Sequence, residues 1–368
     1  GSAQVRTRAM RKRVIQRRLY PLAAVVGLFV ACQGSPDDQS GSLQMLVSEP
    51  VGIMGTQTRL AVVLPTAEVD RGKEILGAAE AELRRIEALM STWIDETEIS
   101  RFNAAVAEEA VPLSADSLEV LNAARQLFDL TEGAFDVTCR PLIERWRLAG
   151  EEDHVPTEEE LAQARQESEW PQIELSEQGA RKTFDTTCVD LSGIAKGFAI
   201  DRALSILRRS EAAGGLVEVG GDLRVFGTGP KGNDWSVGIR SPVENRAWGE
   251  MRLSDGAVCT SGDYARFIEI DGQRYSEIID PRTGHPAERA SSVTVVAEDA
   301  MTADAWATAL SVLGPEGLSL LPADEGIEAL VVTGDGKGGY RVEASEGFST
   351  YLVSSEFGPR LERQAPQP

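Results

Sequence analysis

The sequence predicts an α+β fold, in which one large domain contains a mostly antiparallel sheet flanked by helices. Helical periodicity dominates residues 68–207, and short β-rich runs dominate the chain after Gly214. No Pro-, Gly- or Ser-rich linker separates these two parts after residue 50. Helices and strands gathered in different parts of one chain are typical of α+β folds rather than of folds in which the two alternate.

The helical part opens with one strand. Residues 58–64 (TRLAVVL) predict this strand, and residues 68–90 carry apolar residues at helical spacing. A second helix is predicted over residues 114–130, because Ser114 is a suitable N-cap and Gly133 follows as a stop signal. Similar signals, including a capping box at Thr157, predict three more helices: residues 157–167, 195–207 and 301–313.

The β-rich part contains one strong hairpin signal. Asp271-Gly272 suits a two-residue turn, and it joins strand runs at residues 267–270 and 275–279. The other predicted strands share short apolar runs between turn residues: 216–219, 223–226, 235–239, 291–297, 329–332, 340–343 and 349–353.

Composition narrows the possible functions. The chain has 368 residues, of which 42% are hydrophobic and 26% charged, as expected of a globular protein with a sizeable core. Its 58 acidic residues against 37 basic ones give a net charge of -21, which argues against nucleic acid as a partner. Only His154 and His285 are present, so polyhistidine metal sites and most Ser-His-Asp triads are excluded.

The N-terminal segment predicts export. Basic residues without an acidic one precede the apolar run 20–31, which is shorter than the roughly 20 residues that span a bilayer and suits a signal peptide. The run ends in Ala31-Cys32, which resembles a bacterial lipobox. We expect a lipid anchor at Cys32 that holds the protein at a membrane of the cell envelope, facing the periplasm. An ordinary signal peptide with a chance cysteine is the alternative.

The expected domain boundaries follow from this interpretation. They are a lipoprotein signal peptide at residues 1–31, a flexible tether at 32–50, the folded domain at 51–355 and a C-terminal tail at 356–368. Within the domain, Cys139, Cys188 and Cys259 allow one internal disulfide or remain as free thiols.

A glycine-containing run predicts a phosphate site. In residues 190–201 (DLSGIAKGFAID), Gly193 and Gly197 let the phosphates of a ligand approach N–H groups at the start of a helix. Lys196 adds a positive charge. A glycine turn that leads into an amphipathic helix is the alternative.

A second candidate site lies in the predicted helix 301–313. Asp304 and Thr308 are four residues apart and therefore share one helical face. A carboxylate and a hydroxyl without a soft ligand nearby suit Mg²⁺ rather than zinc. The alternative is an Asp favoured by the helix dipole, with a Thr that bonds back to a carbonyl.

Three further runs contain polar or aromatic residues that could contact a ligand, and the first two lie at the ends of predicted strands. Residues 260–264 (TSGDY) and 275–286 (YSEIIDPRTGHP) gather hydroxyls and carboxylates in loops, although the second run also suits a simple turn. In residues 135–146, Asp136 is a possible acceptor for a heterocycle and Trp146 a possible stacking partner, whereas a Trp in the core is the commoner case.

Taken in order, these runs resemble the motifs of the ApbE family of flavin transferases. The matching segments are Met54-Gly-Thr56, Met90-Ser-Thr-Trp93, Ser100-Arg-Phe-Asn103, Phe135-Asp136-Val-Thr138, Asp190-Leu-Ser-Gly193-Ile-Ala-Lys196-Gly197, Gly220-Gly221-Asp222, Thr260-Ser261-Gly262-Asp263-Tyr264, Asp280-Pro-Arg-Thr283-Gly284, and Asp304 with Thr308. The resemblance implies a single ApbE-like domain. It also agrees with the lipobox, since many family members are exported lipoproteins.

The resemblance implies an activity and a set of site residues. Family members use Mg²⁺ and FAD to attach FMN, through its phosphate, to a threonine hydroxyl of a partner flavoprotein, and AMP is released. The implied Mg²⁺ ligands are Gly193 through its carbonyl, Asp304 and Thr308. The implied FAD contacts form a larger set: Met54, Trp93, Ala134, Phe135, Asp136, Asp190, Lys196 and Ile278.

One position departs from the family pattern. The family usually carries His where this sequence has Glu277, and that His assists deprotonation of the attacking threonine. Glu277 is then the candidate base, with Lys196 helping to hold the diphosphate, but a carboxyl pKa of about 4.3 makes it a weaker base near neutrality. Two alternatives stay open: an FAD pyrophosphatase that yields FMN and AMP, and a non-catalytic flavin-binding lipoprotein.

Overall fold

The computed structural model describes residues 42–168, 170–241, 246–262, 267–287, 290–335 and 339–356. The expected signal peptide, Cys32, Asp263 and Tyr264 lie outside these residues, as does most of the expected tail. None of the helices in the described part has the length and apolar character needed to cross a membrane.

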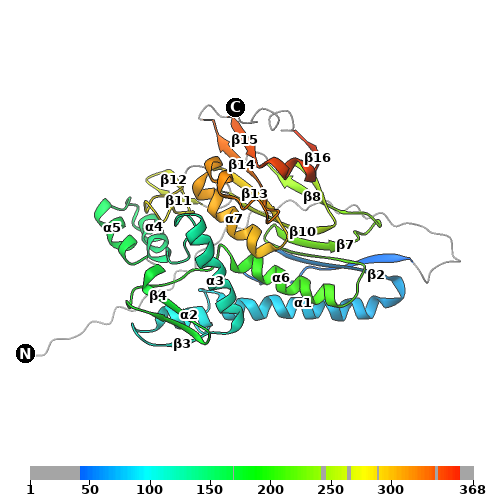
Figure 1. Cartoon of the computed structure of the whole chain (residues 1–368), viewed down its shortest axis with the longest axis horizontal. Helices are drawn as coiled ribbons and strands as arrows, with labels where there is room; N and C mark the ends of the chain where they lie inside the picture. The colour runs from blue at the N-terminus through cyan, green and yellow to red at the C-terminus, as the bar shows by residue number, and fades with distance from the viewer. Residues whose placement is uncertain are drawn as a thin grey trace, which may run out of the picture. The chain divides into compact units, whose positions relative to one another are not determined.

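An eight-stranded sheet organises the domain (Figure 1). All neighbouring strands in it are antiparallel. In spatial order the strands are β1 (Leu43–Ser48), β2 (Thr58–Pro65), β6 (Gly214–Val219), β7 (Asp222–Gly227), β10 (Asp255–Gly262), β13 (Ser292–Ala297), β14 (Glu328–Gly334) and β15 (Tyr340–Ala344). The predicted α+β class with an antiparallel sheet is confirmed.

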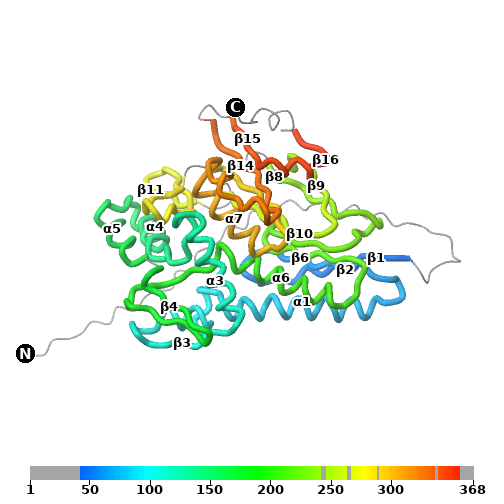
Figure 2. The backbone as a smooth tube through the Cα atoms, viewed as in Figure 1, coloured from blue at the N-terminus to red at the C-terminus, as the bar shows by residue number. Residues whose placement is uncertain are grey.

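Three helices cover one face of this sheet: α1 (Val69–Met90), α6 (Ala195–Arg209) and α7 (Ala300–Leu313). Figure 2 shows α1 and α6 running side by side. The largest core cluster lies between helices and sheet, and α7 contributes buried residues on all its sides. A helix that is buried on nearly all its sides must be enclosed by protein, which fixes α7 at the centre of the domain.

A small sheet covers the opposite face. Its strands, in the order β16-β9-β8, are β8 (Trp235–Arg240), β9 (Ala247–Leu253) and β16 (Leu352–Ser355). Buried and exposed residues alternate strictly along β8, as expected of a strand with one face on a core. A second core cluster, which includes Trp235, Trp248 and Phe348, joins the two sheets.

The remaining helices and small sheets lie together at one end of the helical layer, beyond the C-terminal end of α1 (Figure 1). They are α2 (Glu98–Ala104), α3 (Ala115–Leu130), α4 (Arg140–Glu152), α5 (Glu158–Gln166), the sheet of β3 (Val111–Pro112), β5 (Gly179–Lys182) and β4 (Ile173–Ser176), and the hairpin of β11 (Phe267–Ile270) and β12 (Gln273–Ser276). The described chain also contains 3₁₀ turns at Thr66–Glu68, Trp170–Gln172, Pro315–Leu320 and Glu346–Tyr351.

Local signals predicted several of these boundaries correctly. Ser114 caps α3 by accepting from the Ser117 N–H, and Thr157 and Glu160 form the predicted capping box of α5. At the tip of the β11–β12 hairpin, Asp271 and Gly272 both have positive φ, as a two-residue turn of this type requires.

The structure differs from one tether prediction and two strand predictions. Residues 43–48, placed in the flexible tether, form the edge strand β1, because β2 offers them a complete antiparallel partner. The strand predicted over residues 275–279 ends at Ser276, so Glu277 lies outside it. Within residues 349–353, a 3₁₀ turn that buries Phe348 continues to Tyr351, and the strand begins only at Leu352.

No element was predicted at α2, α4, the β3–β5–β4 sheet, β9 or β10. Residues 260–262, expected in a loop, are instead the last three residues of β10, where they pair with β13. The cysteines Cys139, Cys188 and Cys259 are free thiols in this structure, which agrees with the second of the two alternatives.

Candidate functional site

The turn before α6 meets α7 at the predicted magnesium ligands. The Thr308 hydroxyl lies 3.5 Å from the Gly193 carbonyl oxygen. A Cβ added at Gly193 would lie 3.1 Å from Thr308 Oγ1 and 3.5 Å from the ring of Phe135. The structure therefore brings two predicted metal ligands and a predicted FAD contact to one place.

Asp304 lies one helical turn before Thr308 and is buried, with 4% of its surface exposed. Its Oδ2 accepts a hydrogen bond of 2.9 Å from the Gly197 N–H. Burial raises the pKa of Asp304, and the nearby Lys196 ammonium opposes this shift. A Cβ at Gly197 would lie 2.1 Å from the Ala300 carbonyl oxygen, so only glycine lets α6 approach α7 this closely.

Lys196 has a partner that the sequence did not indicate. Its ammonium forms an ion pair with Asp222, whose Oδ1 also accepts from the Thr260 N–H at 2.8 Å. Burial favours the neutral amine, but the carboxylates of Asp222 and Asp304 raise the pKa of Lys196, so it remains charged. The Gly220-Gly221-Asp222 run was the available signal for this partner.

A second residue that sequence reasoning missed is Asp201, the last residue of the glycine-containing run. Its carboxylate accepts from the backbone N–H groups of Ala300 (2.8 Å) and Met301 (2.9 Å) at the start of α7. The same carboxylate pairs with Arg224 on β7 at 2.8 Å. Asp201 thus fixes the N-terminus of α7, and with it Asp304, against α6 and the sheet.

The predicted flavin motif lies beside this cluster. Ala134, Phe135 and Asp136 are all buried. Asp136 Oδ1 accepts from both the backbone N–H (2.8 Å) and the hydroxyl (2.6 Å) of Thr138. Burial raises the pKa of Asp136 to about 7, and the hydrogen bonds from Thr138 oppose this.

A backbone contact joins the flavin motif to the glycine run. The Asp190 N–H donates to the Val137 carbonyl at 2.7 Å. The side-chain amide of Asn103 bonds both the N–H and the carbonyl of Val189, each at 2.8 Å. These contacts fix the backbone on which Asp190 is carried.

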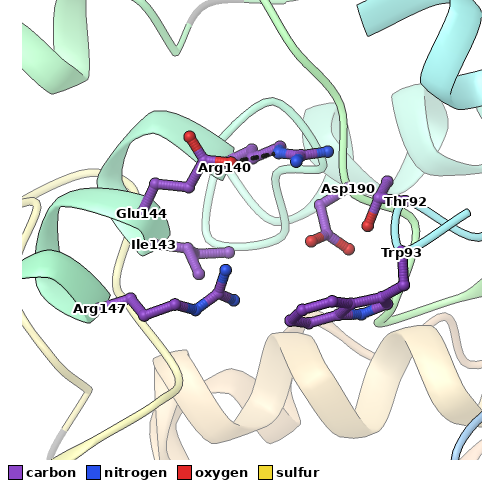
Figure 3. A pocket seen from close by; sticks show the side chains of 7 residues that line it. All are labelled: Thr92, Trp93, Arg140, Ile143, Glu144, Arg147 and Asp190. Atoms are coloured by element: carbon purple, nitrogen blue, oxygen red, sulfur yellow. Dashed lines mark hydrogen bonds and ion pairs between the residues drawn. The ribbon is translucent and has the colours of Figure 1, made fainter. Parts of the chain in front are cut away.

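An open pocket lies at this junction (Figure 3). The exposed ring of Trp93 and the half-buried carboxylate of Asp190, two of the predicted FAD contacts, face it. One side of α4 forms the opposite wall and contributes residues that the sequence did not indicate. The complete lining is Thr92, Trp93, Arg140, Ile143, Glu144, Arg147 and Asp190.

Met54 and Trp93 share one end of α1. The Met54 N–H donates to Glu87 Oε1 of α1 at 2.8 Å, and Met54 has a left-handed backbone with φ of 47°. Trp93 follows the last residue of α1 within a few positions. Both predicted FAD contacts are therefore held by the C-terminal end of the same helix.

Glu277 is exposed and directly follows β12. Its neighbour Ile278 packs on a small cluster formed by Ala134 and Ala287 together with Val312 and Leu313 at the end of α7. This packing brings the segment that carries Glu277 against both the flavin motif and α7.

Side chains from two of the candidate runs, residues 135–146 and 275–286, have structural roles. Trp146 is 1% exposed, and its indole N–H donates to the Gly284 carbonyl at 2.8 Å, so it belongs to the core and is no stacking partner for a ligand. His285 lies 3.2 Å from Glu158 of α5. Asp280 accepts from the backbone and guanidinium of Arg282, which is the turn expected as the alternative.

The chain is a single-domain α+β protein in which a carboxylate, a hydroxyl and a carbonyl oxygen gather between two central helices, beside a pocket with an exposed Trp. The sequence pattern of the ApbE family matches residues 54–331. The chain belongs to the ApbE family.

Known proteins resemble this chain in both sequence and fold. An FAD:protein FMN transferase of Vibrio cholerae is 35% identical over 316 residues, which cover 84% of this chain and 91% of the relative. The solved structure of flavin transferase ApbE from Vibrio cholerae has a TM-score of 0.75 at 32% identity and covers 84% of this chain and 100% of its own. The structure of the apo form of flavinyl transferase ApbE from Pseudomonas stutzeri has a TM-score of 0.73 at 30% identity. The match covers 85% of this chain and 98% of the Pseudomonas stutzeri chain.

Proposed function

We propose that this chain is an FAD:protein FMN transferase that transfers FMN from FAD to a threonine hydroxyl of a partner flavoprotein and releases AMP. One observation supports this most strongly: Gly193 lies against both Thr308 and Phe135. An oxygen cluster suited to a phosphate-bound cation thus touches the predicted flavin motif. Membership of a family whose relatives carry this activity by name supports the same conclusion.

The oxygen cluster fits Mg²⁺. Asp304, Thr308 and the Gly193 carbonyl supply only hard oxygen donors, and Mg²⁺ commonly combines one or two carboxylates with water and substrate phosphates. In the described part of the chain, no three His, Cys, Asp or Glu side chains gather as a metal site, so Asp304 would be the acidic ligand of the cluster. A bound Mg²⁺ would neutralise the charge that develops on the diphosphate oxygens.

The remaining chemistry belongs to the protein's own groups. The charged Lys196, fixed by Asp222, supplies positive potential beside the cluster. Glu277 takes the proton from the acceptor hydroxyl, whose oxygen forms a bond to the FMN-side phosphorus. The bond from that phosphorus to the bridging oxygen breaks, and AMP leaves with that oxygen. The products are an FMN phosphoester on the acceptor and free AMP.

An acceptor assay tests this function. The full-length protein is incubated with FAD, Mg²⁺ and a flavoprotein domain that carries an acceptor threonine, and the acceptor is weighed by mass spectrometry. The expected result is an acceptor heavier by one FMN, with equimolar AMP. Free FMN and AMP without an adduct would instead indicate a pyrophosphatase, and retained FAD with neither product would indicate a flavin-binding protein.

We further propose that the protein is anchored in the cell envelope by a lipid on Cys32, facing the periplasm. The apolar run before Ala31-Cys32 and the basic residues ahead of it support this. Metabolic labelling with a fatty acid tests it. Label should enter the wild-type protein and be lost in Cys32→Ser, and an equally labelled variant would contradict the anchor.

A further inference from the structure

Trp93 presents an unusually exposed aromatic ring to the pocket. It is 77% exposed, whereas Trp146 and Trp170 are each 1% exposed in the core. A large aromatic side chain that gains little from core packing is available to stack on a planar ligand.

Arg147 approaches the ring of Trp93 from across the pocket. The guanidinium carbon of Arg147 lies 5.1 Å from the ring centroid, which is within the range of a cation–π interaction. Arg147 belongs to α4, on the side of the helix that lines the pocket (Figure 3). The guanidinium therefore reaches Trp93 from α4, whereas Trp93 itself belongs to the loop after α1 on the other side of the pocket.

The two arginines of this wall differ in their partners. Arg140 forms an ion pair of 2.7 Å with Glu144, one turn later on α4. For Arg147, by contrast, no carboxylate of the described residues lies within ion-pair distance. The charge of Arg140 is thus neutralised locally, while the described contact of Arg147 is the indole of Trp93.

We propose that Arg147 is a positioning residue for the flavin: its guanidinium holds the Trp93 ring in the pocket so that the ring can stack on the isoalloxazine of FAD. This inference rests on the proposed function. A planar cation on the indole restricts the ring to few orientations before the ligand arrives, so less freedom is lost when FAD binds. Arg147 acts through Trp93, and its removal should matter only while Trp93 is present.

A double-mutant cycle with the full-length protein tests this dependence. FAD is titrated into wild type, Arg147→Ala, Trp93→Ala and the double variant, and binding is followed by quenching of flavin fluorescence, which reports stacking on the indole. We expect Arg147→Ala to weaken FAD binding about five- to tenfold and to reduce the quenching at saturation. In the Trp93→Ala background the same change should alter the affinity less than about twofold.

Two further variants control the experiment. Arg147→Lys keeps a cation and should bind FAD more tightly than Arg147→Ala. Arg208→Ala removes another arginine placed 5.1 Å from an aromatic centroid, that of Phe226, and should leave FAD binding and quenching unchanged.

The outcomes separate the two proposals. An unchanged affinity in Arg147→Ala, or a loss of equal size with and without Trp93, would overturn the positioning role while leaving the transferase activity of the wild type intact. A wild-type protein that neither binds FAD nor modifies the acceptor would instead overturn the proposed function, and the role of Arg147 with it.

Discussion

The backbone N–H of Gly197 donates to the buried carboxylate of Asp304 at 2.9 Å, and this hydrogen bond joins α6 to α7. Gly197 directly follows Lys196, so the turn that carries the charged ammonium also orients the candidate metal ligand. Asp201 reinforces the same junction by accepting from the first residues of α7. The site thus depends on how closely these two helices approach.

Gly197→Ala should therefore damage both fold and activity. The new Cβ would lie 2.1 Å from the Ala300 carbonyl oxygen, so the helices must separate, at a cost of about 1–3 kcal/mol or more. Gly77→Ala on α1 is the matched control, because nothing lies within 4 Å of its new Cβ, and it should stabilise the protein by about 0.5–1 kcal/mol. Urea denaturation measures both changes, and equal effects would contradict this account.

Asp304→Asn should lower the transfer activity without lowering the stability of the fold. Loss of the carboxylate should lower FMN transfer about a hundredfold or more, because the hard anionic ligand for Mg²⁺ is gone. The folded protein should not become less stable, since burial disfavours the charged carboxylate and an amide oxygen still accepts from Gly197. Transfer assays over a series of Mg²⁺ concentrations, paired with thermal melts without FAD, test both parts. Full activity of the variant, or of the wild type in excess chelator, would refute the role of Asp304.

Glu277→Gln should slow transfer about a hundredfold, because the amide keeps the shape of the side chain but accepts no proton. FAD affinity should stay the same, since only the attacking hydroxyl loses its base. Glu277→His should transfer FMN at least as fast as the wild type near neutrality, because an imidazole with an ordinary pKa of about 6.5 is a stronger base than an ordinary carboxylate. Single-turnover rates with saturating FAD measure these effects, and a Gln variant as fast as wild type would remove Glu277 from the mechanism.

The buried carboxyl of Asp136 predicts a pH dependence of stability. Burial raises its pKa to about 7 in the folded protein from an ordinary value of 3.8. Between about pH 4 and pH 7 the folded state keeps a proton on Asp136 that the unfolded state has released. The contribution of this carboxyl to the free energy of unfolding is therefore fully present below about pH 4 and is lost as the pH rises to about 7. The loss amounts to at most about 4 kcal/mol.

Asp136→Asn should remove this contribution, because the amide does not titrate. The free energy of unfolding of the variant, measured without FAD from pH 4 to pH 8, should fall less steeply than that of the wild type. Parallel curves for the two proteins would show that Asp136 is ionised in the folded state throughout.

Local sequence was sufficient to predict those features of the structure that depend on residues close together in the chain. The caps at Ser114 and Thr157, the Asp271-Gly272 turn and the shared helical face of Asp304 and Thr308 all follow from residues within a few positions of one another. The α+β class was predictable for the same reason, since the periodicity of each element is a local property.

Contacts between distant segments were decided only by the tertiary structure. The Thr308–Gly193 contact spans 115 positions. The family resemblance implied that both residues bind one metal ion, but no periodicity or turn signal in either segment indicates its partner. Tertiary packing likewise produced three other contacts: the Lys196–Asp222 ion pair, the approach of Arg147 to Trp93 and the pairing of residues 43–48 with β2. Sequence determined which side chains are able to do chemistry here, and packing of α6, α7 and α4 determined which of them meet. Burial of apolar faces brings these helices together, and polar contacts such as those of Asp201 with the start of α7 then fix the junction.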